Sequence, residues 1–446
     1  MRNSTSSRTI FSWSIYDFAN QPFTTLVVTF IYGTFFTQVI AENEISGTLL
    51  WSRGVTITGI MVAILSPIMG AFADKGGYRK LYLFFWTWVC VIGSLILYFP
   101  QEGQITFALT AFIISNVGFE MGSVFCNAFL PDIAPKEKIG RISGYGWSFG
   151  YVGGLLALAL GLVFFIQPDI PVFGLDKSTY EHIRGTNVMA GLWLAVFSVP
   201  TFLFVEQKKG TAVEISPLIK QSIGQLKETF LHIQQYKEMV KFLIARLIYN
   251  DGLITIFAFG GIYAAGTFDF TFQEIMFFGI VLNVTAGLGA FMLGFLDDKI
   301  GGKKTILISN CGLIIACCLA VFTPNEDLFD ISLPIYGNLV ITGRMVFWTA
   351  GILIGIFSGP NQSASRSLMA RFIPKDRENE FFGFFAFSGK ATAFLGPFLL
   401  GYLTHAFGSQ RFGIAVVLLF LLLGTYLLNS VDEEAGIEAG KTGMKQ

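Results

Sequence analysis

The chain has 446 residues, of which 53% are hydrophobic and only 13% carry a charge, whereas an average soluble domain is about 25% charged. With 30 basic and 30 acidic residues the formal net charge is zero, so the balance of charge does not point to nucleic acid as a partner. This composition excludes a water-soluble globular fold of this size and indicates a protein whose main solvent is lipid.

Stretches long and apolar enough to cross a bilayer as helices, about 20 residues each, recur twelve times along the chain. They lie near residues 11–38, 50–72, 80–99, 104–130, 142–166, 187–205, 239–266, 272–296, 304–322, 338–370, 379–404 and 411–429. We therefore expect an all-α polytopic membrane protein with twelve transmembrane helices. The tenth stretch is long enough to include a turn outside the membrane.

The loops between these stretches carry charge unevenly. Loops that follow even-numbered stretches are basic and contain Lys75, Arg79, Lys80, Lys136, Lys138, Arg141, Lys299, Lys303, Lys304, Arg371, Lys375 and Arg377. The opposite loops are poor in Lys and Arg, with Lys177 and Arg184 as the main exceptions. Because basic loops are retained in the cytoplasm, this bias places both termini there, in the plasma (inner) membrane if the source is a bacterium.

The segment 206–238 divides the chain into two halves of six spans, 1–205 and 239–430. Its apolar residues recur at helical spacing among lysines and glutamates, which favours an amphipathic helix on the cytoplasmic membrane surface over a plain solvated linker. We expect the polar, glycine-containing tail 431–446 to be disordered. The five cysteines lie in apolar stretches without metal-ligand spacing, so no metal site is expected.

The two halves resemble each other in sequence. Residues 134–150 align without a gap over residues 373–389, and residues 70–80 align over residues 294–304. Both matches fall at corresponding places, the fourth-to-fifth and the second-to-third loop of each half. Parallel six-helix repeats related by an axis along the membrane normal are the architecture of major facilitator transporters.

Motifs inside these matches resemble that superfamily. The run that contains Gly70, Asp74, Gly77, Arg79 and Lys80 is similar to the superfamily's loop motif between its second and third helices. The second half carries another copy of this motif, with Gly294, Asp298, Gly301, Lys303 and Lys304. The resemblance implies that the acid pairs across the interface between the two bundles and sets the conformational balance.

Longer blocks are more specific. They are YDFANQPF at 16–23, NAFLPDIA at 127–134 and SRSLMARFIPKDRENEFFGFFAFSGKATAFLGP at 365–397, which resemble the unknown-major-facilitator family. Relatives in that family include the autophagy-linked vacuolar amino-acid effluxer of fungi. The resemblance covers nearly the whole chain, implies the major facilitator fold with two pseudo-symmetric six-helix bundles, and leaves the substrate open.

Charged side chains inside the spans are the site candidates, because a charge at the bilayer centre costs about 2.5 to 3.5 kcal/mol and normally faces a cavity or a partner. In the first span, Asp17 precedes Asn20, Gln21 and Pro22. The proline removes a backbone donor, and the polar neighbours suggest that this break faces protein or water. The alternative is that Asp17 only caps the cytoplasmic end of its helix.

Glu120 lies about sixteen residues into the fourth span and shares one helical face with Asn116 and Asn127. Desolvated and without a nearby cation in sequence, it is our candidate to bind and release a proton, with a structural hydrogen bond as the alternative. Lys390, in the middle of the eleventh span, is expected to be its functional counterpart, either as an ion pair or as an anchor for an anion. A stem that snorkels to the interface is the alternative for Lys390.

The seventh span contributes Arg246, Tyr249, Asn250 and Asp251 near mid-membrane. We expect Asp251 to line the cavity as the counterpart of Asp17, and Arg246 to pair with one of these two acids.

In the tenth span, Gln362 and Arg366 lie one turn apart, and the repeat places Arg366 opposite Asn127. Its proximity to a basic loop leaves a purely topogenic role for Arg366 open. Asn283, central in the eighth span, is a weaker candidate.

These features favour a monomeric secondary transporter that moves a small polar solute, with amino acids as candidates, across the lipid bilayer by alternating access. Protons are the candidate coupling ion. The alternative is a non-transporting receptor or assembly factor on the same fold, although a scaffold would not need such costly charges. No nucleotide loop or metalloprotease motif is present in the sequence, so we expect no cofactor and no enzymatic activity.

Overall fold

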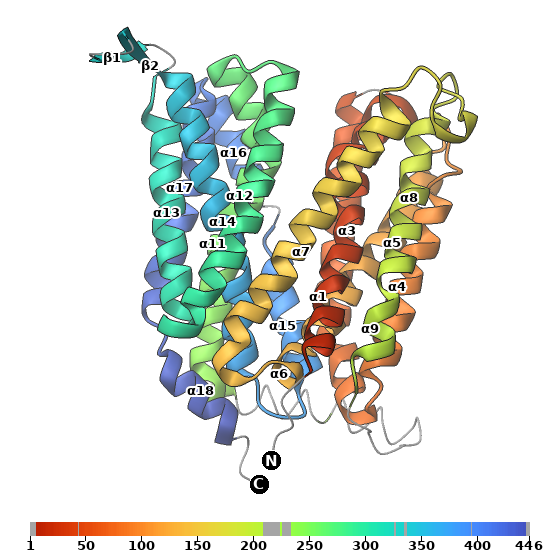
Figure 1. Cartoon of the computed structure of the whole chain (residues 1–446), viewed down its shortest axis with the longest axis vertical. Coiled ribbons are helices and arrows are strands. Elements are labelled where there is room, and N and C mark those ends of the chain that lie inside the picture. The colour runs from red at the N-terminus through yellow and green to blue at the C-terminus, as the bar shows by residue number, and fades with distance from the viewer. Residues whose placement is uncertain are drawn as a thin grey trace.

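The computed structural model describes residues 6–42, 44–207, 224, 233–324, 327–333, 337–393 and 395–442. Figure 1 shows two bundles of helices side by side, with both ends of the chain at the same end of the molecule. We call this the termini end and the opposite one the far end.

The N-terminal bundle is built from long helices with short extensions. Its elements are α1 Ser7–Pro22, η1 Phe23–Phe30, α2 Tyr32–Phe35, η2 Phe36–Ile40, α3 Glu44–Gly76, α4 Arg79–Ile96, α5 Ile105–Asn127, α6 Leu130–Ile133, η3 Lys136–Lys138, α7 Ile139–Leu160, η4 Gly161–Ile166, η5 Val172–Gly174, α8 Glu181–Phe197 and α9 Val199–Phe204. Beyond Pro22, which lacks a backbone donor, the first span widens into π-helix, and the Ile31 amide donates to the Leu26 carbonyl at 3.0 Å.

The C-terminal bundle repeats this plan. Its elements are η6 Ile233–Tyr236, α11 Lys237–Phe268, α12 Phe272–Ile300, α13 Gly302–Phe322, β1 Asp327–Leu333, β2 Gly337–Thr342, α14 Gly343–Phe372, α15 Glu378–Lys390, α16 Leu395–Phe407, α17 Gln410–Asn429 and α18 Glu433–Thr442. The two strands pair antiparallel and project from the far end in Figure 1.

Eleven helical segments of the described chain are long and apolar enough to cross a membrane. The 30-residue α14 is equally long but more polar, because it carries buried residues such as Ser358, Asn361, Ser365 and Arg366. It runs within the C-terminal bundle in Figure 1, and together these segments match the twelve predicted spans. The expected polytopic, helical architecture of two bundles is therefore confirmed.

Three expectations about individual segments need correction. Residues 338–342 of the predicted tenth span belong to β2, outside the bundle. The eleventh span is broken: α15 ends at Lys390, and α16 begins at Leu395, two residues before Pro397, which cannot donate a backbone hydrogen bond.

The tail is the third correction, because residues 433–442 form α18 rather than a disordered segment. Its packing against α14 and α11 supplies the stabilisation that its polar sequence does not reveal. Most of the expected amphipathic helix in 206–238 lies outside the described residues.

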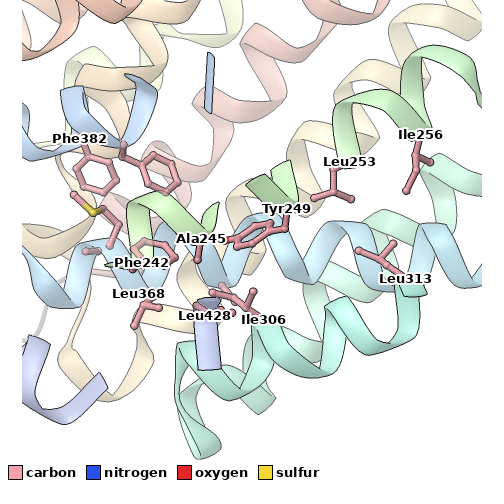
Figure 2. Packing of buried hydrophobic residues seen from close by; sticks show 14 of the residues in the cluster. Phe242, Ala245, Tyr249, Leu253, Ile256, Ile306, Leu313, Leu368, Phe382 and Leu428 are labelled. Atoms are coloured by element: carbon pink, nitrogen blue, oxygen red, sulfur yellow. The ribbon is translucent and has the colours of Figure 1, made fainter. Parts of the chain in front are cut away.

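One face of α11 carries the core of the C-terminal bundle. Phe242, Ala245, Tyr249, Leu253 and Ile256 follow one another at three- and four-residue spacing and are all buried. Figure 2 shows them packed against Ile306 and Leu313 of α13, Leu368 of α14, Phe382 of α15 and Leu428 of α17. Large apolar side chains elsewhere, such as Phe84 and Trp88 on α4, are exposed, as expected for a surface that faces lipid.

The two bundles touch through a symmetric pair of contacts, α3 against α15 and α7 against α12. In each contact a glycine allows the helices to approach closely. A Cβ on Gly383 would lie 2.6 Å from the Ser66 carbonyl oxygen, and one on Gly144 would lie 2.5 Å from the Ala290 carbonyl oxygen. In Figure 1, α7 crosses toward α12 near the termini end, while the ribbons of the bundles diverge toward the far end.

Candidate functional site

A charge pair joins the two bundles in the middle of the spans. The Lys390 Nζ atom, at the end of α15, lies 2.7 Å from the Glu120 Oε1 atom of α5. The Lys390 side chain is 36% exposed and that of Glu120 is 17% exposed, so neither is sealed in the core. Because α15 ends at this lysine, its positive charge also lies at the negative end of the helix dipole. The pair agrees with the ion-pair alternative stated for Lys390.

A second charge pair is more deeply buried and lies where α14 meets α1, α5 and α7. The Arg366 guanidinium donates to the carboxylate of Asp17 at 2.8 Å, to the Asn127 side chain at 3.0 Å, and to both the hydroxyl and the carbonyl of Ser143. It also stacks near the rings of Trp13 and Trp147. An arginine that is 4% exposed at its side chain and bonded to three helices of the other bundle is not merely topogenic.

A glycine makes this second pair possible. A Cβ on Gly146 of α7 would lie 2.4 Å from a carboxylate oxygen of Asp17 and 2.6 Å from a guanidinium nitrogen of Arg366. Any larger residue would therefore displace the ion pair. Glycine is needed at position 146 for this close approach.

The α11 candidates form a network within the C-terminal bundle. Arg246 donates at 2.8 Å to the Phe385 carbonyl and to the Ser388 hydroxyl, and its guanidinium lies 3.6 Å from the centre of the Phe385 ring. The expected pairing of Arg246 with Asp251 or Asp17 is therefore wrong. Proximity along the helix pointed to Asp251, but the arginine side chain is directed toward α15.

Two amides extend this network toward α14. The Asn250 side chain donates to the Gly389 carbonyl at 3.1 Å, and Gln362 donates to the Asn250 side-chain oxygen at 3.2 Å. The Tyr249 hydroxyl lies 2.7 Å from the Ser365 hydroxyl. Asn250 and Gln362 thus connect to the residue directly before Lys390.

The Asp251 carboxylate is buried beside Thr392, in the break between α15 and α16. Among the described residues, no Lys or Arg lies within ion-pair distance of it. It is therefore placed differently from Asp17, its expected counterpart, whose charge is paired with Arg366.

The remaining predicted site residues take lesser places. Asn20 donates to the Ser123 hydroxyl at 3.4 Å, and Gln21 lies against Gly154 of α7. Asn116 is buried one turn from Glu120 on α5. Asn283 donates to the Gly279 carbonyl of its own helix at 2.8 Å, and among the described residues it makes no bond to either charge pair.

The loop motif of the first half caps a helix of the other bundle. The Asp74 carboxylate accepts hydrogen bonds from the backbone amides of Asn379 at 3.1 Å and Glu380 at 2.9 Å. These are the second and third residues of α15, whose amides lack partners inside the helix. Arg79 lies nearby and binds Asp132 and Glu378, each at 2.9 Å. Gly70 lets α3 approach, since a Cβ there would lie 2.4 Å from the Asn379 carbonyl oxygen.

The second copy makes the symmetric contact. Asp298 accepts hydrogen bonds from the amides of Gly140 at 2.8 Å and Arg141 at 3.3 Å, the second and third residues of α7. The Arg141 guanidinium also binds the Asp298 carboxylate. Gly294 lies against this start of α7, because a Cβ on Gly294 would lie 3.1 Å from the Arg141 Cα atom. The termini end is thus closed by two matched helix caps.

Glycines shape the turns in both copies. Gly77 and Gly301 have φ angles of 64° and 91°, which favour glycine. After these turns, the Lys80 ammonium donates to the Val205 carbonyl and the Lys303 ammonium to the Asn429 carbonyl, each at 2.9 Å. Lys304 is exposed and takes no part in these bonds.

Each bundle also caps its own third helix with the segment after its sixth span. The Lys80 amide of α4 donates to the Gln207 side chain at 2.7 Å. In the second bundle, the amides of Gly302 and Lys303 donate to the Glu433 carboxylate at 2.9 and 3.0 Å.

Sequence reasoning missed several members of the closed termini end. Arg371, counted only as a loop charge, binds Asp297 at 2.7 Å and lies 3.5 Å from Glu433. The repeat carried a signal, because the alignment of 134–150 over 373–389, extended two residues, sets Arg371 against Asp132, the acid that binds Arg79. Ser143, which holds Arg366, gave no such signal.

Two helical bundles with matched contacts at one end and charge pairs between them in mid-span define a membrane transporter of the major facilitator type. Comparison with known proteins gives the particular family. The chain belongs to the family described as "Vacuole effluxer Atg22 like", whose model matches residues 50–441.

Curated relatives cover nearly the whole chain. It is 25% identical over 435 residues to the "Uncharacterized MFS-type transporter YxiO" of Bacillus subtilis, an alignment that covers 96% of each chain. It is 22% identical to "Autophagy-related protein 22" of Saccharomyces cerevisiae, over 91% of this chain and 81% of the relative.

Solved structures show the same fold. The transporter FucP in the outward conformation matches with a TM-score of 0.70 at 13% identity, covering 96% of this chain and 98% of FucP. The proton:xylose symporter XylE matches with a TM-score of 0.69 at 13% identity, covering 95% of both chains.

Proposed function

We propose that this protein is a secondary active transporter that moves a small polar solute by alternating access, with amino acids as the first candidates. The observation that carries the proposal is the Glu120–Lys390 pair, which joins the two bundles in mid-span and stays partly exposed. A solute with an anionic group can replace Glu120 as the partner of Lys390. The family description names an effluxer, so export is the first direction to test.

Alternating access requires the closed end to open. The caps formed by Asp74 and Asp298 hold α3 to α15 and α7 to α12, so this arrangement corresponds to a state closed at the termini end. The opposite state must release both caps and must separate Arg366 from Asp17 and Ser143, because these partners belong to different bundles. A substrate that binds the opposite state more tightly would shift the equilibrium away from the state that these contacts stabilise.

Protons are the proposed coupling ion, and Glu120 is the proposed carrier. In this state the ammonium of Lys390 balances the negative charge of the Glu120 carboxylate. When Lys390 binds an anionic group of the substrate, the carboxylate loses its counter-charge and takes up a proton more readily. Substrate binding and protonation of Glu120 would therefore favour each other.

We further propose that both termini lie in the cytoplasm and that a bacterial protein of this sequence resides in the inner membrane. The support is the excess of Lys and Arg in loops at the termini end. An impermeant thiol reagent applied to intact cells should label Lys177→Cys but not Lys138→Cys, in a Cys311→Ser background. Labelling of Lys138→Cys from outside would overturn this orientation.

The transport proposal is tested on purified full-length protein. A thermal-shift screen against amino acids, peptides and organic anions should identify a stabilising solute, whose transport is then measured in proteoliposomes with and without a pH gradient. Glu120→Gln, which mimics the protonated form, should retain exchange but lose gradient-driven accumulation. Lys390→Met should weaken solute binding itself.

Two results would contradict the proposal. If Glu120→Gln still concentrated the solute at the wild-type rate, Glu120 would be structural and Asp251 the next candidate. If no solute bound and no flux occurred in folded wild-type protein, a non-transporting receptor or assembly factor would be the better description.

A further inference from the structure

A groove of about 490 Å³ lies between α13 and α14, apart from the charge pairs described above. Its lining is apolar and includes Leu307, Ile308, Cys311 and Ile315 of α13 and Leu353 and Phe357 of α14. Figure 1 shows α13 on the outer side of its bundle, away from the N-terminal bundle. Because Ile308, Cys311 and Ile315 are exposed there, the groove opens toward lipid.

The groove depends on one glycine. A Cβ on Gly312 would lie 2.2 Å from the Phe357 ring, so no other residue fits without a shift of that ring. The alignment of 70–80 over 294–304, extended along the helix, sets Gly312 against Trp88 of α4. The Trp88 ring packs 5.9 Å from that of Phe84, which corresponds to Ile308. The two halves therefore differ at this position, where the first carries an indole and the second carries no side chain.

A basic side chain stands at one end of the groove. Lys304, Ile308, Cys311 and Ile315 are spaced by four, three and four residues, so they share one face of α13. Lys304 lies about 6 Å along the helix axis from Ile308, toward the termini end. Its side chain is exposed and, among the described residues, forms no ion pair.

We propose that this face of α13 binds an anionic phospholipid, with the headgroup at Lys304 and one acyl chain in the groove. An apolar groove that opens into a bilayer is filled by acyl chains, and the lysine selects a lipid with a negative headgroup. From Ile308 to Ile315 the groove runs about 10 Å along the helix axis, which suits part of one acyl chain. The site does not depend on the transported solute.

The test uses full-length protein in detergent and native mass spectrometry with added phosphatidylglycerol or phosphatidylcholine. Wild-type protein should retain phosphatidylglycerol in preference to phosphatidylcholine. Lys304→Gln should reduce the retained phosphatidylglycerol about fivefold, the factor expected for one lysine near an anionic surface. Cys311→Trp should reduce it by filling the groove.

Two matched controls separate this site from the general lipid surface. Lys138→Gln removes an exposed lysine at the same end of the other bundle, and Ile92→Trp adds an indole to an exposed site on α4. Both should retain phosphatidylglycerol as wild type does. Soluble glycerol phosphate should not displace the lipid, because it lacks the acyl chain.

A second measurement needs no variant. Cys311 is the exposed cysteine among the five, so its alkylation by N-ethylmaleimide reports on the groove directly. Phosphatidylglycerol should slow this alkylation more than phosphatidylcholine does. Equal retention of the two lipids, unchanged retention in Lys304→Gln and Cys311→Trp, or displacement by glycerol phosphate would each overturn the proposal.

Discussion

Lys390 and Glu120 belong to different bundles, yet their charged groups lie 2.7 Å apart. The lysine ends α15, directly before the break in the eleventh span, and the glutamate sits within the unbroken α5. A pair that spans the interface in this way must be made and broken when the bundles move against each other.

Exchanging the two charges tests whether the pair matters as a pair. Glu120→Lys and Lys390→Glu each place like charges side by side, so each should reduce solute exchange at least about tenfold, consistent with coupling of about 0.5 to 3 kcal/mol between contacting residues. The double variant restores opposite charges and should recover part of the exchange rate in proteoliposomes. A double variant no better than its worse parent would show that the residues act separately.

Arg366 should contribute more to stability than its partners do. Arg366→Ala leaves the Asp17 carboxylate without its cation, a change that costs about 3 to 5 kcal/mol for a buried pair. Arg366→Lys should cost less but not be neutral, since an ammonium cannot reach Asp17, Asn127 and Ser143 together. Asp17→Asn should be mildest, because the guanidinium keeps its bonds to Asn127 and Ser143 and the new amide still offers it an oxygen. Thermal denaturation in detergent should give this order, and a reversed order would contradict the role assigned to the guanidinium.

Asp74 and Asp298 should control conformation rather than solute binding. Asp74→Asn weakens the cap on α15 by removing the charge that faces the helix dipole, a loss of about 0.5 to 2 kcal/mol. Transport should slow while equilibrium affinity stays within a few-fold, and Asp298→Asn should behave alike because its contact is the symmetric one. Calorimetric binding and flux measured on the same preparation distinguish these effects. Complete loss of binding in folded protein would refute the assignment.

The contact glycines allow a steric test of the closed end. Gly144→Ala and Gly383→Ala each add a Cβ within 2.6 Å of a backbone atom in the other bundle, so they should force the helices apart. Spin labels at Lys138 and Lys299 should report a longer distance across the termini end. Gly260→Ala and Gly279→Ala are the controls, since a Cβ there meets nothing within 4 Å. Equal distances in all four variants would mean that these contacts do not hold the end closed.

Glu433 should stabilise the C-terminal bundle through its cap on α13. Glu433→Ala removes the acceptor for the amides of Gly302 and Lys303, so the midpoint of thermal unfolding should fall by an amount equivalent to about 0.5 to 2 kcal/mol. The neighbouring Glu434 is exposed, and Glu434→Ala is the control. A comparable loss in both variants would attribute the effect to the helicity of α18 rather than to the cap.

Much of the fold could be predicted from the sequence because hydropathy and the internal repeat are independent signals that agree. The repeat also located Asp74 and Asp298 at equivalent places, and both cap a helix of the other bundle. The pairing of Glu120 with Lys390 was accessible as a hypothesis, since a charge in mid-span needs a partner.

The wrong predictions concern individual side-chain contacts that produce no periodic pattern in the sequence. The sequence suggested Asp251 or Asp17 as the partner of Arg246, but the arginine donates to a carbonyl and a hydroxyl of α15. Every residue type has a backbone carbonyl, so the sequence does not mark this partner. The tail was expected to be disordered because its composition is polar. Its order depends on individual bonds, such as those of Glu433, that composition does not encode.

The two caps supplied by Gln207 and Glu433 bear on the biogenesis of the chain. Synthesis proceeds from the N-terminus. The first bundle obtains its cap from residue 207, directly after its last helix, so it can be completed before the second bundle exists. The cap of the second bundle comes from residue 433, so it forms only when almost the whole chain has been synthesised. In a product truncated before α18, the first amides of α13 would lack this acceptor, and Arg371 would lack the nearby Glu433 carboxylate. Truncation before α18 therefore removes the cap on the third helix of the second bundle but not that of the first.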